Sequence, residues 1–241
     1  TMAKDFAADG ASVTITGRRE EGASIAEKIG CDFVRCDVRD ENSVQDAYTK
    51  VIDLHASKID VIILNAGVAV DTDGLESTPS SVMEDLVATN MMGVYYGLKN
   101  APQHMPDGGS IIVTGSIAGS GFTAFGNAEY AATKAGAAYL ARTAAIEFAP
   151  RNIRVNVVAP ATIEGTGMMV ADDGSEMSKF FGSFSALGRM GSHKEAVAIY
   201  RFLASDASSY VTGQEIRVDG GVTAGFGVPV MEALMKQAGI A

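Results

Sequence analysis

The sequence predicts a single α/β domain, in which a doubly wound parallel sheet carries helices on both faces. Short apolar runs alternate along the chain with longer segments of helical periodicity, and this alternation is typical of βαβ units. A run such as Val61–Leu64 has no polar residue among its apolar ones, as expected of a strand that is buried on both faces. The length of 241 residues suits one α/β domain.

The predicted strands are apolar runs that are rich in β-branched residues. In chain order they are Val13–Thr16, Phe33–Cys36, Val61–Asn65, Ile111–Thr114, Arg154–Val158 and Glu215–Val218. The segments between them have apolar residues at helical spacing. These predicted helices are Glu20–Ile29, Asn42–Ser57, Ser80–Gln103, Ala128–Phe148 and Lys194–Ala204.

Two segments depart from this alternation. Residues 1–10 match the last turns of a helix that stops at Gly10, because glycine commonly follows a helix C-terminus. We expect residues of about 162–190 to form a partly apolar flap over a substrate, with an ordinary surface loop as the alternative. Met168, Met169, Phe180, Phe181 and Phe184 in this stretch indicate a partly apolar pocket.

Composition limits the classes of partner. The net charge is −10 and the pI is about 4.7, which disfavours nucleic acids and anionic membranes. The chain has neither a stretch as long as a membrane span nor a signal-peptide pattern at its start. Its cysteines, Cys31 and Cys36, are too few for a disulfide framework and lack further ligands at metal-binding spacing. We therefore expect a cytoplasmic protein without a metal site.

Tyr130 and Lys134 form a candidate reacting centre. Their i, i+4 spacing puts a phenol and an ammonium on one face of a predicted helix, with Cβ atoms about 5–6 Å apart. A free tyrosine has a pKa near ~10, and a nearby positive charge lowers that pKa toward neutral pH. The pair indicates acid–base chemistry, although the same spacing also occurs by chance on surface helices.

Polar residues at the ends of predicted strands support this centre. Ser116 follows one buried strand, and Asn65-Ala66-Gly67 ends another. Ligands of open parallel sheets bind beyond the carboxyl ends of the strands, so Ser116 is placed to bind a substrate oxygen. Asn90 lies in an apolar helix, where a buried amide needs a hydrogen-bond partner.

Together these residues resemble the short-chain dehydrogenase/reductase family, and the likeness covers almost the whole chain. Asn90, Ser116, Tyr130 and Lys134 match the family's Asn-Ser-Tyr-Lys tetrad in order and closely in spacing. Asn65-Ala66-Gly67 resembles the motif after the family's fourth strand. Residues 187–191, 205–214 and 218–221 resemble its C-terminal signatures.

The resemblance implies a Rossmann-like fold and hydride transfer between a nicotinamide cofactor and a small ketone, aldehyde or secondary alcohol. Tyr130 then exchanges a proton with the substrate oxygen, which Ser116 binds. Lys134 lowers the pKa of Tyr130 and binds the nicotinamide ribose. Asn90 supports a water molecule that links Lys134 to solvent.

The cofactor residues also follow from the resemblance. Asp37 matches the residue that receives the adenine amino group. An NAD-preferring member usually has an acid after its second strand, whereas this chain has Gly17 followed by Arg18 and Arg19. Guanidinium groups suit a 2′-phosphate, which favours NADP, while NAD stays usable if Arg18 stacks on adenine. The other implied cofactor residues are Val38, Asn65, Ala66, Gly67, Tyr130, Lys134 and Ile163.

Two features depart from the family pattern. The family's first strand and its Gly-rich turn have no counterpart in the sequence. We therefore expect roughly 15–25 further residues before Thr1, the length of a strand, a turn and one helical turn. The threonine that holds the cofactor carboxamide falls one place late, at Thr166, and Ile163 is better placed for this contact.

The family likeness further implies a homotetramer or homodimer that associates through the helices bearing Asn90 and Tyr130. A non-catalytic sensor that binds a nicotinamide nucleotide on the same fold is the main alternative function, since fold alone does not establish catalysis. A serine hydrolase is disfavoured, because Ser116 lacks a Gly-x-Ser-x-Gly elbow and a partner histidine at a matching position. The sequence does not identify the substrate.

Overall fold

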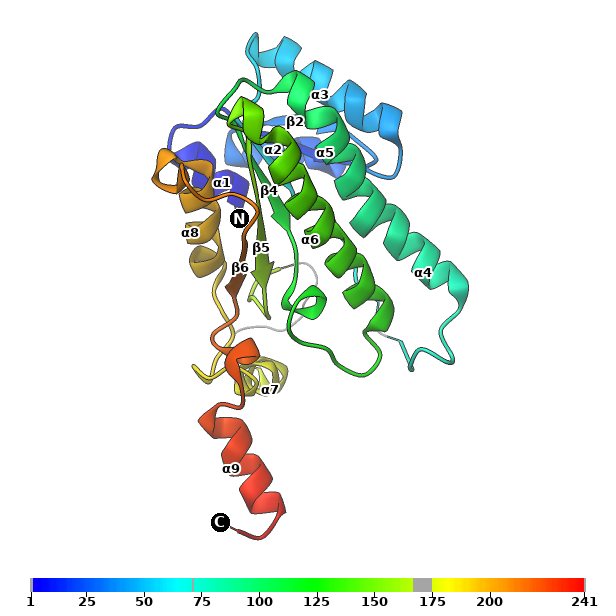
Figure 1. Ribbon diagram of the computed structural model, residues 1–241, viewed down its shortest axis with the longest axis vertical. Coiled ribbons are helices and arrows are strands. Elements are labelled where there is room, and N and C mark those ends of the chain that lie inside the picture. The colour runs from blue at the N-terminus through cyan, green and yellow to red at the C-terminus, as the bar shows by residue number, and fades with distance from the viewer. Residues whose placement is uncertain (1, 71, 167–174, 241) are drawn as a thin grey trace.

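The computed structural model describes residues 2–70, 72–166 and 175–240 of the chain. It confirms the predicted α/β architecture, with parallel strands between layers of helices (Figure 1). Each predicted strand is present, and its ends lie within about two residues of the predicted ones, the usual uncertainty of element boundaries. The strands are β1 (Thr14–Gly17), β2 (Asp32–Arg35), β3 (Val61–Leu64), β4 (Ser110–Thr114), β5 (Arg154–Pro160) and β6 (Glu215–Val218).

The strands form two hydrogen-bonded groups. One has the order β3-β4-β5-β6, and the other is the pair β1-β2. Within the described residues no ladder joins β1 to β3, at the place where the family resemblance puts a further strand. Val61 and Ile63 of β3 are half-buried, whereas Ile111 of β4 is fully buried.

The predicted helices are also present. The helices are α1 (Met2–Ala8), α2 (Glu21–Ile29), α3 (Glu41–His55), α4 (Ser80–Leu86), α5 (Gly93–His104), α6 (Ala128–Phe148), α7 (Glu176–Ser183), α8 (His193–Ala204) and α9 (Val228–Gln237). Their ends carry local signals: Asp40 accepts a hydrogen bond from Asn42 N before α3, and Ser192 and Glu195 form a capping box at α8.

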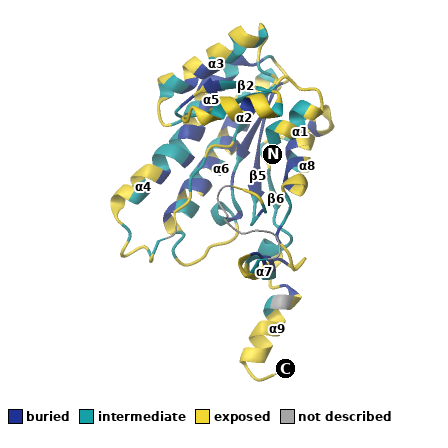
Figure 2. Cartoon of the chain, turned by 180° about the vertical axis from the view of Figure 1, so that it is seen from behind, coloured by how far each residue is buried: buried dark blue, intermediate teal, exposed yellow. Residues whose placement is uncertain are grey.

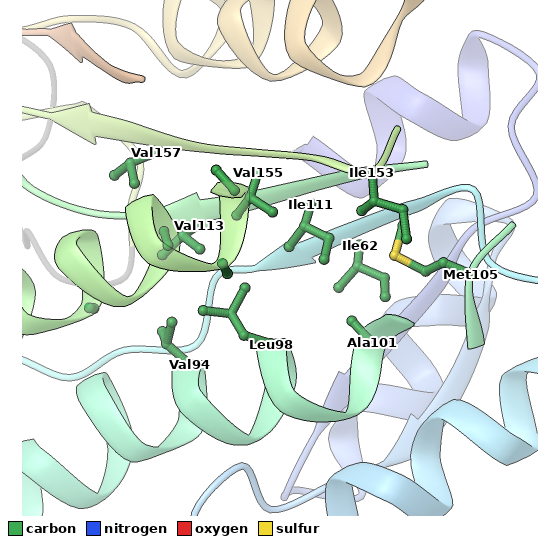
Figure 3. Packing of buried hydrophobic residues seen from close by; sticks show 14 residues of the cluster. Ile62, Val94, Leu98, Ala101, Met105, Ile111, Val113, Ile153, Val155 and Val157 are labelled. Atoms are coloured by element: carbon green, nitrogen blue, oxygen red, sulfur yellow. The ribbon is translucent and has the colours of Figure 1, made fainter. Parts of the chain in front are cut away.

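Helices cover both faces of the four-stranded sheet. Alternate side chains of a strand point to opposite faces, so Ile111 and Val113 pack against α5 and α6, as Figure 3 shows. Ile112 and Val158 pack on the opposite face with Leu203 of α8, where α1 also lies. Each such fully buried side chain stabilises the fold by about 1.5–3 kcal/mol.

The predicted helix Ser80–Gln103 contains an irregular segment. Residues Val87–Met92, between α4 and α5, are π-helical, and Asn90 lies in this segment with no exposed surface. A π-helical turn holds an extra residue, which changes the direction of the side chains that follow it. The sequence predicted the helix but not this turn.

Two helices were not predicted. Helix α7 forms within the predicted flap, where Ser175 Oγ accepts a hydrogen bond from Ser178 N at the start of the helix. Helix α9 projects from the body of the molecule near the C-terminus, as Figure 2 shows. The predicted flap residues Met168 and Met169 lie outside the described residues.

Candidate active site

Tyr130 and Lys134 lie one turn apart near the start of α6, as predicted. Lys134 is buried, and its Nζ lies 5.7 Å from the centroid of the Tyr130 ring. This Nζ donates a hydrogen bond of 2.9 Å to the carbonyl oxygen of Thr114, at the end of β4. This bond fixes helix α6 to the carboxyl end of the four-stranded sheet.

Burial shifts the pKa of both groups. It lowers the pKa of Lys134 to about 8, because the charged ammonium is taken out of water. It also raises the pKa of Tyr130, and a hydrogen bond with Ser116 partly offsets this rise. Lys134 is not among the causes of this shift, so the expected lowering of the Tyr130 pKa by Lys134 stays a prediction.

Ser116 is positioned by a tight turn after β4. Its Oγ accepts a hydrogen bond of 3.2 Å from Ala118 N and lies within hydrogen-bonding reach of the Tyr130 phenol. A Cβ on Gly119 would come within 2.7 Å of Ala135 N on α6. Only glycine therefore lets this turn approach α6 closely enough to bring Ser116 and Tyr130 together.

Asn90 joins two parts of the site. Its Oδ1 accepts a hydrogen bond of 2.8 Å from Val68 N, and its Nδ2 donates to Val68 O at 2.9 Å and to Thr133 Oγ1 at 3.2 Å. Both amide hydrogens are therefore used by the protein. Asn90 holds the segment after β3 against α6, and the predicted link to Lys134 through a water stays a prediction.

The segment Asn65-Ala66-Gly67 follows β3 at the same edge of the sheet. Asn65 Oδ1 accepts a hydrogen bond of 3.0 Å from Thr114 Oγ1, which also bonds Tyr200 Oη at 2.8 Å. Asn65 and Ala66 are exposed. The ends of β3 and β4 thus lie side by side. The exposed residues Asn65 and Ala66 lie next to Thr114, whose carbonyl oxygen accepts the hydrogen bond from Lys134.

A second group of charged residues lies at the ends of β1 and β2. Arg39 donates from Nε to Asp37 Oδ1 at 3.1 Å and from Nη2 to Asp37 Oδ2 at 2.9 Å. These bonds lower the pKa of Asp37, and the charge of Arg18 contributes to the same shift. Arg18 is exposed, and Val38 packs close to Gly93 of α5.

Sequence reasoning missed Arg39. The available signal was its position two residues after Asp37, a spacing at which a side chain can reach back to the carboxylate. The structure shows both oxygens of Asp37 already bonded to Arg39. An adenine amino group at Asp37 would therefore share this carboxylate with a guanidinium.

Ile163 is buried at the end of β5, in a parallel bridge with Gly191. Thr166 Oγ1 donates to Ile163 O at 3.1 Å, so this threonine is engaged locally. A cavity of about 260 Å³ lies beside this segment, between the ends of β5 and β6 and helix α7. Its lining includes Thr162, Phe181 and Arg217, but neither Ser116 nor Tyr130.

Comparison with known proteins agrees with this geometry. Residues 1–223 match the family model described as enoyl-(acyl carrier protein) reductase. The 3-oxoacyl-[acyl-carrier-protein] reductase of Chlamydia pneumoniae is 35% identical over 230 residues, which cover 92% of this chain and 91% of that protein. The chain belongs to the short-chain dehydrogenase/reductase family. It is an oxidoreductase of this family with the Rossmann-like fold that the sequence predicts.

The chain is also similar to other proteins along most of its length. The sorbose reductase of Schizosaccharomyces pombe is 34% identical over 235 residues, covering 92% of this chain and 89% of that protein. A solved structure of ElxO with NADP bound has a TM-score of 0.86 at 27% identity and covers 93% of both chains. A short-chain dehydrogenase/reductase of Serratia marcescens has a TM-score of 0.83 at 27% identity, covering 92% of this chain and 91% of that one.

Proposed function

We propose that this protein is an NADP-dependent reductase or dehydrogenase that interconverts a small ketone or aldehyde and the corresponding secondary alcohol. The observation that carries the proposal is that the turn bearing Ser116 packs directly on α6 at Gly119, which brings the Ser116 hydroxyl to the Tyr130 phenol beside the buried Lys134. These groups come from two segments that only the fold brings together. A hydroxyl and a phenol that converge in this way can bind and protonate one carbonyl oxygen.

Each residue of the tetrad has a role in this proposal. Ser116 binds the substrate oxygen and orients it toward Tyr130, whose phenol gives its proton to that oxygen in reduction and takes it back in oxidation. Lys134 stabilises the phenolate that remains, because its ammonium lies beside the ring. Asn90 holds the segment after β3 in place. The nicotinamide, when bound, supplies or accepts the hydride.

The residues present fit a dinucleotide that carries a phosphate on its adenosine ribose. Arg18 is an exposed cation, and its charge reaches Asp37. A guanidinium is suited to a phosphate, whereas Gly17 offers no carboxylate for free ribose hydroxyls. ElxO, which was solved with NADP bound, supports this choice over NAD.

The rest of the dinucleotide follows the carboxyl edge of the sheet in this proposal. Asp37 and Val38 contact the adenine. The backbone of Asn65-Ala66-Gly67 contacts the part of the dinucleotide that lies between the adenine and the nicotinamide ribose. Tyr130 and Lys134 hold the nicotinamide ribose. Ile163, at the end of β5, contacts the carboxamide.

We also propose that residues 162–190 cover the substrate. Phe181 of α7 lines the cavity beside the site, which gives the cavity a partly apolar wall. Methionine and phenylalanine side chains adapt to varied apolar shapes. The lining also includes Arg189, Arg217 and Asp219, so a small carbonyl compound with both an apolar part and polar groups suits this face.

Assembly through α5 and α6 belongs to the same proposal. Ala132 and Ala135 of α6 are exposed, and Tyr139 and Ile146 add large apolar groups to this surface. Ala137, by contrast, is buried in the chain's own core, so it does not contribute to such an interface.

No helix of the described residues is long and apolar enough to cross a membrane. The proposed location is the cytoplasm.

A substrate screen tests the proposed activity. The purified protein is incubated with NADPH or NADH and a panel of ketones and aldehydes, and with NADP or NAD and a panel of alcohols. Loss or gain of nicotinamide absorbance reports hydride transfer. We expect turnover with NADPH on at least one carbonyl compound. A complete lack of turnover in both directions contradicts the proposal.

One relative favours a second function. The cyclic-di-GMP-binding biofilm dispersal mediator protein of Escherichia coli is 31% identical over 221 residues. A nucleotide-binding role without catalysis is therefore the competing proposal for this chain. Calorimetric binding of cyclic-di-GMP, together with an absence of turnover on the panel, would support it.

A further inference from the structure

The end of β6 lies at the same edge of the sheet as Ser116. The strand β6 pairs in parallel with β5, and β5 pairs in parallel with β4, which ends shortly before Ser116. Arg217 is the next-to-last residue of β6. Its neighbours Ile216 and Val218 pack on the face that α8 covers. Alternate side chains of a strand point to opposite faces, so Arg217 points to the face that α6 covers.

Arg217 contacts the turn that follows Ser116. Its Nη2 donates a hydrogen bond of 2.5 Å to the carbonyl oxygen of Ser120. A Cβ on Gly121 would lie 3.0 Å from Cζ and Nη1 of Arg217 and 3.1 Å from its Nη2. The guanidinium therefore lies flat against the backbone of Gly121. These contacts join the end of β6 to the turn that carries the serine.

The C-terminal chain holds Arg217 from the other side. Nη1 of Arg217 donates to Thr223 Oγ1 at 3.3 Å, and this hydroxyl donates to Asp219 Oδ2 at 2.6 Å. Asp219 also accepts hydrogen bonds of 3.0 Å from Gly221 N and Thr223 N. Burial raises the pKa of Asp219, but these bonds and the charge of Arg217 outweigh burial and keep that pKa below its ordinary value. Asp219 is therefore an anion that fixes Thr223 beside the guanidinium.

The turn after Ser116 needs an attachment of this kind. The three amides of residues 120–122 all donate to Ile117 O, so these bonds shape the turn without joining it to another element. Ser120 Oγ is buried and has no hydrogen-bond partner among the described residues. The carbonyl of Ser120, rather than its side chain, is thus the group that Arg217 uses to attach the turn to β6.

Arg217 differs from Arg189, the other arginine that lines the cavity beside α7. The two Nη atoms of Arg189 donate to the carboxylate of Glu195 at 2.9 and 2.7 Å, next to the start of α8. Among the described residues, the hydrogen bonds of Arg217 go to neutral oxygens. A hydrogen bond from a charged donor is about twice as strong as one between neutral groups. The charge of Arg217 thus strengthens the attachment of the turn.

We propose that Arg217 is a positioning residue that holds the turn after Ser116, so that the serine hydroxyl meets Tyr130 and the substrate oxygen. Its effect on catalysis rests on the proposed function, whereas the contact with the turn does not. A displacement of reacting groups by about 1 Å can lower a rate by about 10²-fold. The proposal also gives the signature at residues 218–221 a role, because Asp219 orients Arg217 through Thr223.

Kinetics of three variants test the effect on catalysis. Arg217→Met keeps the apolar stem without a donor, and we expect kcat for the carbonyl substrate to fall by at least about tenfold. The Kd for NADPH should stay unchanged. Arg217→Lys keeps one charged donor and should recover part of the loss, which a general loss of packing would not allow. The matched control Arg142→Met removes the same charge from the exposed side of α6 and should keep kcat.

Hydrogen–deuterium exchange of the unmodified chain and the variants tests the contact without any turnover. Arg217→Met should speed exchange at the amides of residues 119–122 but not in α8. Thr223→Val, which removes the hydroxyl between Asp219 and Arg217, should act in the same direction.

Unchanged exchange in both Arg217→Met and Thr223→Val overturns the proposal, and so does an unchanged kcat in Arg217→Met. A loss of kcat that Arg217→Lys does not reduce also contradicts it. If the unmodified chain has no turnover on the substrate panel, the proposed function fails. The exchange rates then decide by themselves whether Arg217 holds the turn.

Discussion

Tyr130 and Lys134 share one face of α6 but are held by different contacts. Lys134 donates to the carbonyl oxygen of Thr114, whereas Tyr130 lies within reach of Ser116. Both side chains are shielded from water, so burial disfavours the charged form of each. A neutral phenol beside an ammonium is suited to giving a proton to a bound carbonyl oxygen.

Replacement of Tyr130 by phenylalanine tests this assignment. The proposed proton donor is lost while the ring remains, so we expect kcat to fall by about 10²–10⁴-fold, the usual contribution of general acid catalysis. The affinity for NADPH, measured by fluorescence titration, should change little. A fall in kcat of less than tenfold would mean that another group supplies the proton.

The pKa of Lys134 predicts a pH-dependent stability. Its folded pKa is about 8, below the unfolded value near ~10.4. Between these two pKa values the unfolded chain therefore binds more protons than the folded chain. Burial of the ammonium destabilises the fold fully below pH ~8, and this destabilisation disappears as the pH rises toward ~10.4. A shift of this size corresponds to about 3 kcal/mol.

The variant Lys134→Met isolates this effect, because methionine has a similar length without a charge. We expect its free energy of unfolding, relative to that of the unmodified protein, to be higher at neutral pH than at a pH near ~10. Urea unfolding at the two pH values measures the difference. A relative stability that does not change with pH would show that Lys134 keeps its ordinary pKa.

At the scale of single elements, the π-helical turn between α4 and α5 positions the site. It turns Asn90 toward Val68 and α6, where the amide makes three hydrogen bonds. Thr133 Oγ1 in turn donates to Tyr130 O. One irregular turn therefore connects the end of β3 to the helix that carries Tyr130.

Replacement of Asn90 by leucine should both destabilise the fold and impair the site. The backbone groups of Val68 would lose their partners, at a cost of about 1–3 kcal/mol for each group that stays buried. We expect a loss of about 2–4 kcal/mol in urea unfolding and a fall in kcat. The matched control is Asn100→Leu on α5, where the side chain bonds Tyr96 O; it should lower stability but leave kcat nearly unchanged.

At the scale of the whole molecule, the proposed dinucleotide site spans both groups of strands. Arg18 and Asp37 belong to the β1-β2 pair, whereas Asn65 and the Lys134 contact belong to the four-stranded sheet. A bound dinucleotide would contact both groups at once. Its binding energy would then stabilise their arrangement as well as orient the substrate.

We expect NADP to raise the unfolding temperature more than NAD at equal concentration. A ligand at a hundredfold excess over its Kd stabilises the folded state by about 2.7 kcal/mol. Differential scanning fluorimetry measures the shift, and Arg18→Gln should remove the advantage of NADP. The control Arg142→Gln, on the exposed side of α6, should keep it. An equal response to both nucleotides would mean that Arg18 does not bind the phosphate.

The sequence by itself determined the succession of the six strands and of most helices along the chain, although not α7 and α9, because the signals of these elements are local. The unbroken apolar run Val61–Leu64 predicted a buried parallel strand, and a strand is present at these residues. The spacing of Tyr130 and Lys134 likewise placed both on one face of α6. Such features depend on residues within one or two turns of each other.

The tertiary structure alone decided how the distant parts meet. It revealed the π-helical turn at Asn90 and the hydrogen bonds that join Asn90 to Val68 and Thr133. It also showed that desolvation raises the pKa of Tyr130. These features depend on burial and on hydrogen bonds between segments that are far apart in sequence. Periodicity carries no information about such contacts, because they form only when the whole chain has packed.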